Sequence, residues 1–208
     1  LARGVRQASD FLMALQLTGA AKKDSIANLQ IRLPIVVIGG GLTAIDTATE
    51  SLAYYPVQVE KFLARYEALS AERGEQAVRA GWSKEEALIA DEFLAHARAL
   101  CDEKKKANPD VNALLDGWGG VKIIYRKRLI DAPSYRLNHE EVEKAFEEGI
   151  FIAENYEPAG VEIDAFGAAK AIKLKKLSPL EGEGRVGGEP RSDATSVTPP
   201  PNLPPQGG

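Results

Sequence analysis

Cysteine is almost absent from this sequence, which contains one, Cys101, among 208 residues. A single cysteine cannot form an internal disulfide, a C-x-x-C redox pair or the ligand set of an iron–sulfur cluster. Because Cys101 follows Leu100 in a helical pattern, we interpret it as a packed residue rather than a reactive thiol. The two histidines, His96 and His139, are not part of a recognised metal-ligand motif. We therefore predict no metal site and no catalytic residue in this chain.

An excess of one charge and a long apolar run are also missing. The net charge is −4, and 44% of the residues are hydrophobic, which is typical of a soluble domain that has a core. This charge balance gives no reason to expect a nucleic-acid partner. No apolar run approaches the roughly 18 residues that cross a bilayer, and the start has no signal-peptide pattern. We expect a cytoplasmic protein that binds neither nucleic acid nor membrane.

The most informative feature that is present is a glycine-rich turn between an apolar strand and a helix. The predicted strand is residues 35–38 (IVVI), and residues 39–44 (GGGLTA) follow it with G-x-G-x-x-A spacing. In a dinucleotide-binding βαβ unit, Gly39 permits the tight turn, Gly41 lets the backbone approach a pyrophosphate, and Ala44 keeps the helix close to the strand. The N-terminus of the helix offers unpaired N–H groups and a positive dipole end to the phosphates. Other α/β turns share this spacing, so the next strand has to support the assignment.

The next predicted strand, residues 121–125 (VKIIY), ends in three basic residues, Arg126, Lys127 and Arg128. An NAD site has an acidic residue in the corresponding loop, where it accepts hydrogen bonds from the ribose. Arginine instead offers a planar fork of donors to a ribose 2′-phosphate. The loop therefore favours NADP(H) over NAD(H), and the alternative is an ordinary solvated basic loop.

Several segments resemble, in order, those of a known family. They are residues 4–12 (GVRQASDFL), 35–46 (IVVIGGGLTAID), 121–128 (VKIIYRKR), 132–134 (APS) and 140–150 (EEVEKAFEEGI). Together they are similar to the NAD(P)H-binding domain of FAD-dependent pyridine nucleotide oxidoreductases of the glutamate synthase small-subunit type, which includes the amino-terminal part of dihydropyrimidine dehydrogenase. The resemblance extends over most of residues 4–174, apart from one long insertion.

The resemblance implies a set of cofactor-binding residues. Those that surround the pyrophosphate are Gly39, Gly40, Gly41, Leu42, Thr43 and Ala44, and those that include the ligands of the 2′-phosphate are Arg126, Lys127 and Arg128. Which of the three basic residues makes the contact stays open. Leu42 is a departure from the family, which commonly has Asp or Asn at this position, where a polar side chain could cap the helix or orient the cofactor.

The resemblance also implies that this chain needs a partner. In the family, hydride passes from the nicotinamide to FAD, and the FAD lies on a second fold whose sequence flanks the NADPH-binding domain. This chain has no second glycine fingerprint, so we expect a fragment whose flavin domain or subunit lies elsewhere, with iron–sulfur or other electron-transfer domains as further partners. One alternative is a truncated, non-catalytic module that binds a nucleotide or a partner. Another is a free-standing dehydrogenase, but the Tyr/Lys or His acid–base pair that it needs does not stand out.

The predicted fold class is α/β, a Rossmann-like doubly wound nucleotide-binding domain with an inserted helical hairpin and a disordered C-terminal tail. Residues 1–30 are a helical lead-in from the missing flavin domain, and residues 31–177 are the NAD(P)H-binding domain. The hairpin insertion is expected at residues 56–120, either as a surface elaboration or as a part that shapes access to the cofactor. Residues 178–208 are rich in glycine and proline and cannot bury a core, although their proline run could bind a polyproline reader.

Local signals predict the ends of several elements. Ser83 and Glu86 form a capping-box pattern at the second helix of the hairpin, and Asn138 is expected to cap a later helix with Glu141 at its third position. The inward side chains of that later helix are predicted to be Val142, Ala145 and Phe146. The last expected elements are a parallel strand at residues 150–152 and an antiparallel hairpin at residues 161–163 and 171–174.

Overall fold

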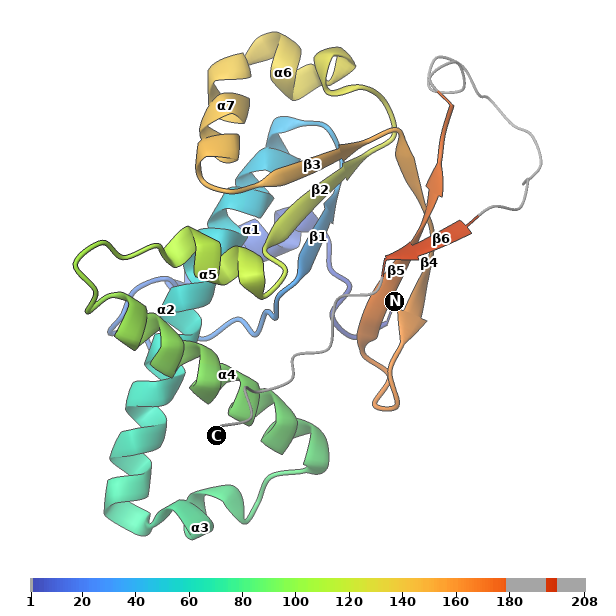
Figure 1. The fold of residues 1–208 in the computed structure, drawn as a ribbon. Helices are drawn as coiled ribbons and strands as arrows, with labels where there is room; N and C mark the ends of the chain where they lie inside the picture. Colours follow the sequence, from blue (N-terminus) through green and yellow to red (C-terminus); the bar gives the residue numbers. More distant parts are fainter. Residues whose placement is uncertain (1, 179–193, 198–208) are drawn as a thin grey trace.

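The computed structural model describes residues 2–178 and 194–197, and a small parallel sheet lies at its centre (Figure 1). The sheet contains β1 (Ile35–Ile38), β2 (Val121–Tyr125) and β3 (Phe151–Glu154) in that spatial order. Both neighbouring pairs are parallel, so the carboxyl ends of the three strands meet at one edge. The prediction of a mixed helix and strand protein with a parallel sheet is confirmed.

One face of this sheet is covered by helices. After β1 the chain forms α2 (Leu42–Arg73), which packs on β1 and β2, and after β2 it forms α7 (His139–Glu147), which packs beside α2. Val142 and Ala145 of α7 are buried in the same core as the sheet, as predicted. The prediction that Phe146 faces inward is wrong, since this residue is 44% exposed. A nine-residue helix has room for only a narrow buried stripe, and the smaller neighbours occupy it.

The opposite face of the sheet carries apolar side chains that stay accessible. Val37 is buried, whereas its neighbours Val36 and Ile38 are 36% and 54% exposed, as expected for side chains that alternate along a strand. Phe151 of β3 is 59% exposed. Parallel sheets normally bury both faces, so the exposure of these side chains is unusual for a parallel sheet.

Two short elements connect β2 to α7. They are the 3₁₀ helix η1 (Leu129–Asp131) and α6 (Pro133–Leu137). Asn138 precedes α7 as predicted, but its side chain forms no capping hydrogen bond, because Glu141 donates its N–H to the backbone carbonyl of Asn138 instead.

The inserted hairpin begins inside α2 rather than after it. We expected a new helix from Pro56, yet α2 continues through this residue to Arg73. A proline removes one helical hydrogen bond, but the burial of Tyr54, Tyr55 and Val59 on either side of it favours the continuous helix. The remaining helices of the insertion are α3 (Glu75–Arg79), α4 (Lys84–Glu103) and α5 (Val111–Gly117).

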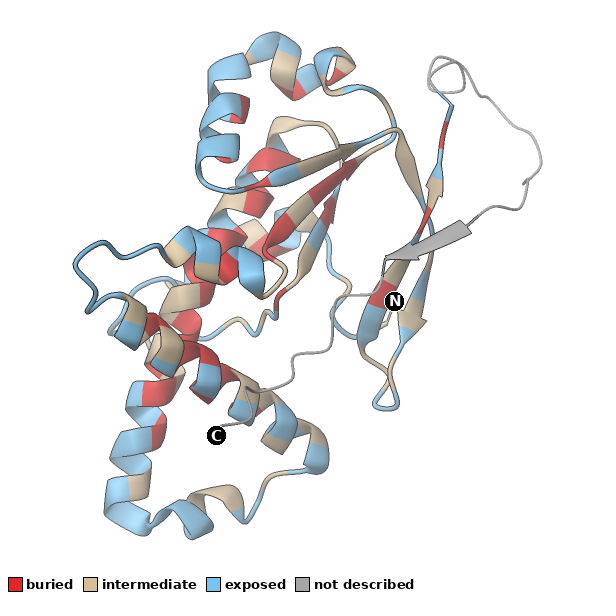
Figure 2. Cartoon of the chain, viewed as in Figure 1, coloured by how far each residue is buried: buried red, intermediate tan, exposed pale blue. Residues whose placement is uncertain are grey.

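The return helix α4 packs along α2 and completes the hairpin, which projects away from the sheet (Figures 1 and 2). The predicted capping box at its start is confirmed, since Ser83 accepts from the N–H of Glu86 and Glu86 accepts from the N–H of Ser83. The rings that meet between α2, α4 and the end of α5, here called the aromatic core, are those of Tyr55, Phe62, Tyr66, Phe93, His96 and Trp118.

The lead-in contains α1 (Ala8–Thr18) and is tied to α2 by buried polar side chains. Gln58 donates to the carbonyl of Ile31 at 2.9 Å and accepts from its N–H at 2.8 Å. Lys61 is only 7% exposed and donates to the carbonyls of Ala20 and Ala27, and its burial lowers the pKa of the ammonium group. The extended part of the lead-in is therefore held in place by hydrogen bonds.

A second, antiparallel sheet follows β3. It consists of β4 (Tyr156–Ile163), β5 (Ala169–Lys176) and β6 (Ala194–Val197). The predicted antiparallel hairpin is confirmed as β4 and β5, which are longer than expected. Strand β6 lies within residues 178–208, where we expected no regular structure. Its backbone pairs with the open edge of β5, which explains the difference, and apart from Ser178 the rest of the predicted tail lies outside the described residues.

Candidate functional site

The glycine turn, residues 39–44, joins β1 to α2 at the carboxyl edge of the parallel sheet. Gly39 has a φ of +149°, which L side chains rarely adopt, and its N–H donates to the carbonyl of Ile124 at 3.1 Å. A Cβ on Gly39 would lie 3.3 Å from the Cβ of Ala44, so the two small residues are needed together. This is the close approach of strand and helix that the sequence predicted.

Gly41 forms the N-cap of α2 and faces open space. A Cβ added to Gly41 would meet no atom within 4 Å. No side chain caps the helix, and within the described residues no acceptor is bonded to the N–H groups of Gly41, Leu42 or Thr43. Free N–H groups at the positive end of a helix dipole attract an anion such as a phosphate. The first turn of α2 can therefore accept a phosphate group without displacing a protein contact.

Gly40 is enclosed, in contrast to Gly41. A Cβ on Gly40 would lie 2.2 Å from the ring of Tyr125, the last residue of β2. On its other side, Ser134 of α6 donates from Oγ to the Gly40 carbonyl at 2.9 Å and from its N–H to the same oxygen at 3.3 Å. We did not predict a role at this turn for Tyr125 or Ser134, although both lie within segments that resemble the family.

The basic loop, residues 126–128, follows β2 at the same edge of the sheet. The pairing of Ile38 with Ile124 brings the glycine turn and the basic loop to adjacent strand ends. Arg126 is exposed and forms no hydrogen bond or ion pair with another described residue. It is therefore free to contact an anion from solvent.

The other two basic residues differ from Arg126 in their surroundings. Arg128 forms a bidentate ion pair with Asp131, at 2.8 and 3.2 Å, and this hydrogen bonding lowers the pKa of the Asp131 carboxyl. Lys127 is half-buried and adds its positive charge near Asp131. The sequence left the choice among the three open. Within the described residues Arg128 pairs with Asp131, whereas neither Arg126 nor Lys127 forms an ion pair, and Arg126 is the more exposed of these two.

His96 and Cys101, which we also considered from the sequence, both contact side chains of the core. Nδ1 of His96 and the Tyr55 hydroxyl form a 2.6 Å hydrogen bond, and the imidazole ring stacks on Trp118. Burial lowers the pKa of this imidazole. The same burial raises the pKa of Tyr55. Cys101 packs half-buried against the main core. Within the described residues no three His, Cys, Asp or Glu side chains are grouped to hold a metal ion.

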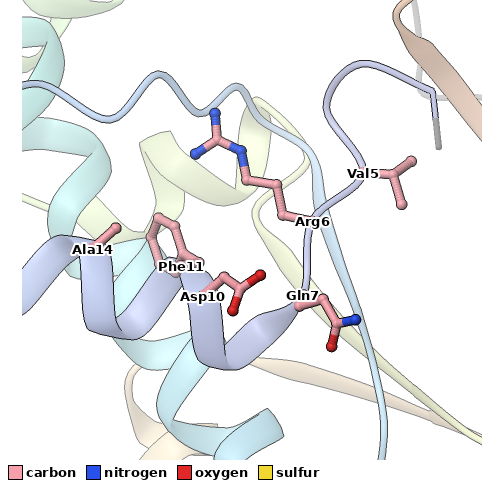
Figure 3. A pocket seen from close by; sticks show the side chains of 6 residues that line it. All are labelled: Val5, Arg6, Gln7, Asp10, Phe11 and Ala14. Carbon is pink, nitrogen blue, oxygen red and sulfur yellow. The ribbon is translucent and has the colours of Figure 1, made fainter.

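A hollow elsewhere on the protein lies beside the first turn of α1 (Figure 3). Its lining residues are Val5, Arg6, Gln7, Asp10, Phe11 and Ala14. None of them belongs to the glycine turn or the basic loop, so this hollow is separate from the candidate nucleotide site. No helix in the described part of the chain is long and apolar enough to cross a membrane.

The chain is therefore a mixed helix and strand protein with a small parallel sheet and a glycine turn at the carboxyl edge of that sheet. Over 180 residues the chain is 41% identical to the uncharacterized protein RP006 of Rickettsia prowazekii (strain Madrid E). This alignment covers 86% of the chain and 24% of the relative, so the chain spans about a quarter of the relative's length. No protein-family model matches the chain.

Proposed function

We propose that this chain is the NADPH-binding part of an FAD-dependent oxidoreductase of the glutamate synthase small-subunit type. The observation that carries the proposal is the uncapped N-terminus of α2 behind the glycine turn, next to the basic loop on the adjacent strand. A phosphate-binding turn and a cationic loop at adjacent strand ends match the two anionic groups of NADP(H), its pyrophosphate and its 2′-phosphate. A cytoplasmic location remains part of this proposal.

The residues at the site fit the cofactor. Gly41 leaves room for the pyrophosphate where a Cβ would otherwise stand, and the N–H groups of Leu42 and Thr43 in the first turn of α2 have no acceptor among the described residues. Arg126 is available for the 2′-phosphate, while Lys127 adds positive charge beside it. When bound, the nicotinamide of NADPH supplies a hydride that FAD accepts. The task of this chain is then to bind and orient the cofactor, which requires no nucleophile.

The sheet supports the finer assignment of a Rossmann-like, doubly wound domain. Its order β1-β2-β3, with α2 and α7 as the connecting helices, corresponds to one half of such a fold. A complete doubly wound sheet continues beyond its first strand and has helices on both faces. Within the described residues β1 has no strand on its other edge, and Val36, Ile38 and Phe151 are exposed. These features support a missing part, which we propose is a flavin domain or subunit or other electron-transfer domains.

The first experiment is a titration of the purified protein with NADPH and with NADH, followed by nicotinamide fluorescence. We expect NADPH to bind more tightly than NADH, because only NADPH carries a 2′-phosphate for the basic loop. Arg126→Glu is expected to weaken NADPH binding at least about tenfold and to leave the weak NADH binding nearly unchanged. Arg98→Glu on α4 is the matched control, since Arg98 is exposed and carries the same charge change far from the glycine turn.

Two results would separate the alternatives. If the folded protein binds neither nucleotide, the cofactor assignment fails. If it binds NADPH but transfers no hydride to FAD even when the flanking flavin sequence is supplied, the non-catalytic binding module becomes the better description.

A further inference from the structure

Ser134 connects two parts of the candidate site that are far apart in sequence. It lies 94 residues from Gly40, and yet its hydroxyl and its N–H both donate to the Gly40 carbonyl, at 2.9 and 3.3 Å. The residue is only 1% exposed. Its own carbonyl accepts from the N–H of Asn138 at 2.8 Å, so the donor is itself held within α6.

These bonds determine which way one peptide group of the turn points. A trans peptide is planar, and its C=O and N–H point in opposite directions. Because the Gly40 carbonyl points toward Ser134, the N–H of Gly41 points away from α6. Within the described residues this N–H has no acceptor, and the space at Gly41 is open. The peptide that Ser134 holds therefore presents a donor that points away from α6 and that no described residue uses.

Consecutive glycines would otherwise leave this peptide free to rotate. The Tyr125 ring limits the space on one side of Gly40, but only Ser134 forms hydrogen bonds to its carbonyl within the described residues. A donor that is already aimed before the ligand arrives spares the ordering cost at binding.

We infer that Ser134 is a positioning residue that aims the Gly41 N–H at the pyrophosphate of the bound nucleotide. This inference rests on the proposed function and adds a residue that does not touch the cofactor. It predicts an effect confined to the pyrophosphate, because the 2′-phosphate is held at the other end of the site by the basic loop.

The test compares two ligands on three proteins. NADPH contains the pyrophosphate, whereas adenosine 2′-monophosphate keeps the 2′-phosphate and lacks the pyrophosphate. The proteins are the wild type, Ser134→Ala and the control Ser70→Ala, which removes a buried hydroxyl that has no hydrogen-bond partner in the described part of the chain. Dissociation constants are measured by calorimetry, and circular dichroism checks that each protein is folded.

We expect Ser134→Ala to weaken NADPH binding about tenfold and to change the affinity for adenosine 2′-monophosphate less than twofold. Ser70→Ala is expected to bind both ligands like the wild type. Equal weakening for both ligands would mean a general loosening of the fold and would overturn the inference, as would unchanged NADPH binding. If the wild type does not bind NADPH, the proposed function fails first, and the inference falls with it.

A measurement on the wild type covers the case in which Ser134→Ala does not fold. In ¹⁵N-labelled protein, the amide proton of Gly41 should shift downfield when NADPH is added and should stay in place with adenosine 2′-monophosphate. A Gly41 amide that does not respond to NADPH contradicts the inference.

Discussion

Helix α2 contributes to two regions, the aromatic core and the carboxyl edge of the sheet. Among the described residues, polar groups are paired in the first region, and several are unpaired in the second. In the aromatic core the Tyr55 hydroxyl and His96 are buried and bonded to each other. At the carboxyl edge the N–H groups of Gly41 and Leu42 have no acceptor among the described residues, and Arg126 has no ion-pair partner there. Satisfied polar groups stabilise a fold, while unsatisfied groups at an accessible edge are available for a ligand. Substitutions should therefore affect stability at the first region and binding at the second.

The largest effect is expected from Tyr55→Ala in the aromatic core. Tyr55 is fully buried and meets Phe93 and Trp118 edge-on, so its truncation leaves a cavity and an unpaired His96. We expect the free energy of unfolding to fall by about 3–5 kcal/mol in urea titrations. Tyr55→Phe keeps the ring and removes only the hydrogen bond, so it should cost about 1–3 kcal/mol. A loss below about 1 kcal/mol for Tyr55→Ala would mean that this core is not a major source of stability.

A smaller and purely functional effect is expected from Gly41→Ala at the carboxyl edge. The backbone at Gly41, with φ −96° and ψ 172°, suits alanine, and its Cβ would meet no atom of the protein within 4 Å. The free energy of unfolding should stay the same or rise by up to about 1 kcal/mol. The Cβ would instead occupy the proposed space of the pyrophosphate, so NADPH binding should weaken at least about tenfold.

The matched control for this substitution is Gly81→Ala between α3 and α4, where an added Cβ also meets no atom within 4 Å. It should leave the affinity for NADPH unchanged. Wild-type affinity in Gly41→Ala would contradict the proposed position of the pyrophosphate.

The smallest effect is a pH dependence of stability at the aromatic core. Burial holds the pKa of His96 below its usual value of 6.5. Between the lowered pKa and 6.5, the unfolded chain binds more protons than the folded protein, so stability rises with pH through this window and is lost as pH falls through it. The slope cannot exceed about 1.4 kcal/mol per pH unit, the limit for one proton.

Urea midpoints measured from pH 7 down to pH 5 test this dependence. His96→Gln should remove the slope in this window, whereas His139→Gln, a change at the exposed histidine, should keep it. A slope that survives in His96→Gln would assign the pH dependence to other groups.

Sequence patterns predicted the strands and the glycine turn because these depend on neighbouring residues. The apolar runs at residues 35–38 and 121–125 form β1 and β2, and the capping box at Ser83 is present. Long-range packing overrode the local signal at Pro56, where a predicted helix boundary lies inside α2.

The candidate site was predicted in part for the same reason. The spacing of Gly39, Gly41 and Ala44 predicts a tight turn with the helix close to the strand, and the structure confirms this local geometry. The contacts of Tyr125 and Ser134 with Gly40 come from elements far along the chain, and no local pattern encodes them. Binding of NADP(H) and transfer to FAD stay predictions.

The length of α2 has a mechanical consequence. A helix of 32 residues is about 48 Å long, and it carries the glycine turn at one end and the return of the hairpin at the other. The hairpin and the candidate nucleotide site thus lie at opposite ends of one helix, and Pro56, which cannot donate a backbone hydrogen bond, lies between them. Because helices bend most readily at proline, a bend of α2 at Pro56 would change the direction of the hairpin relative to the glycine turn.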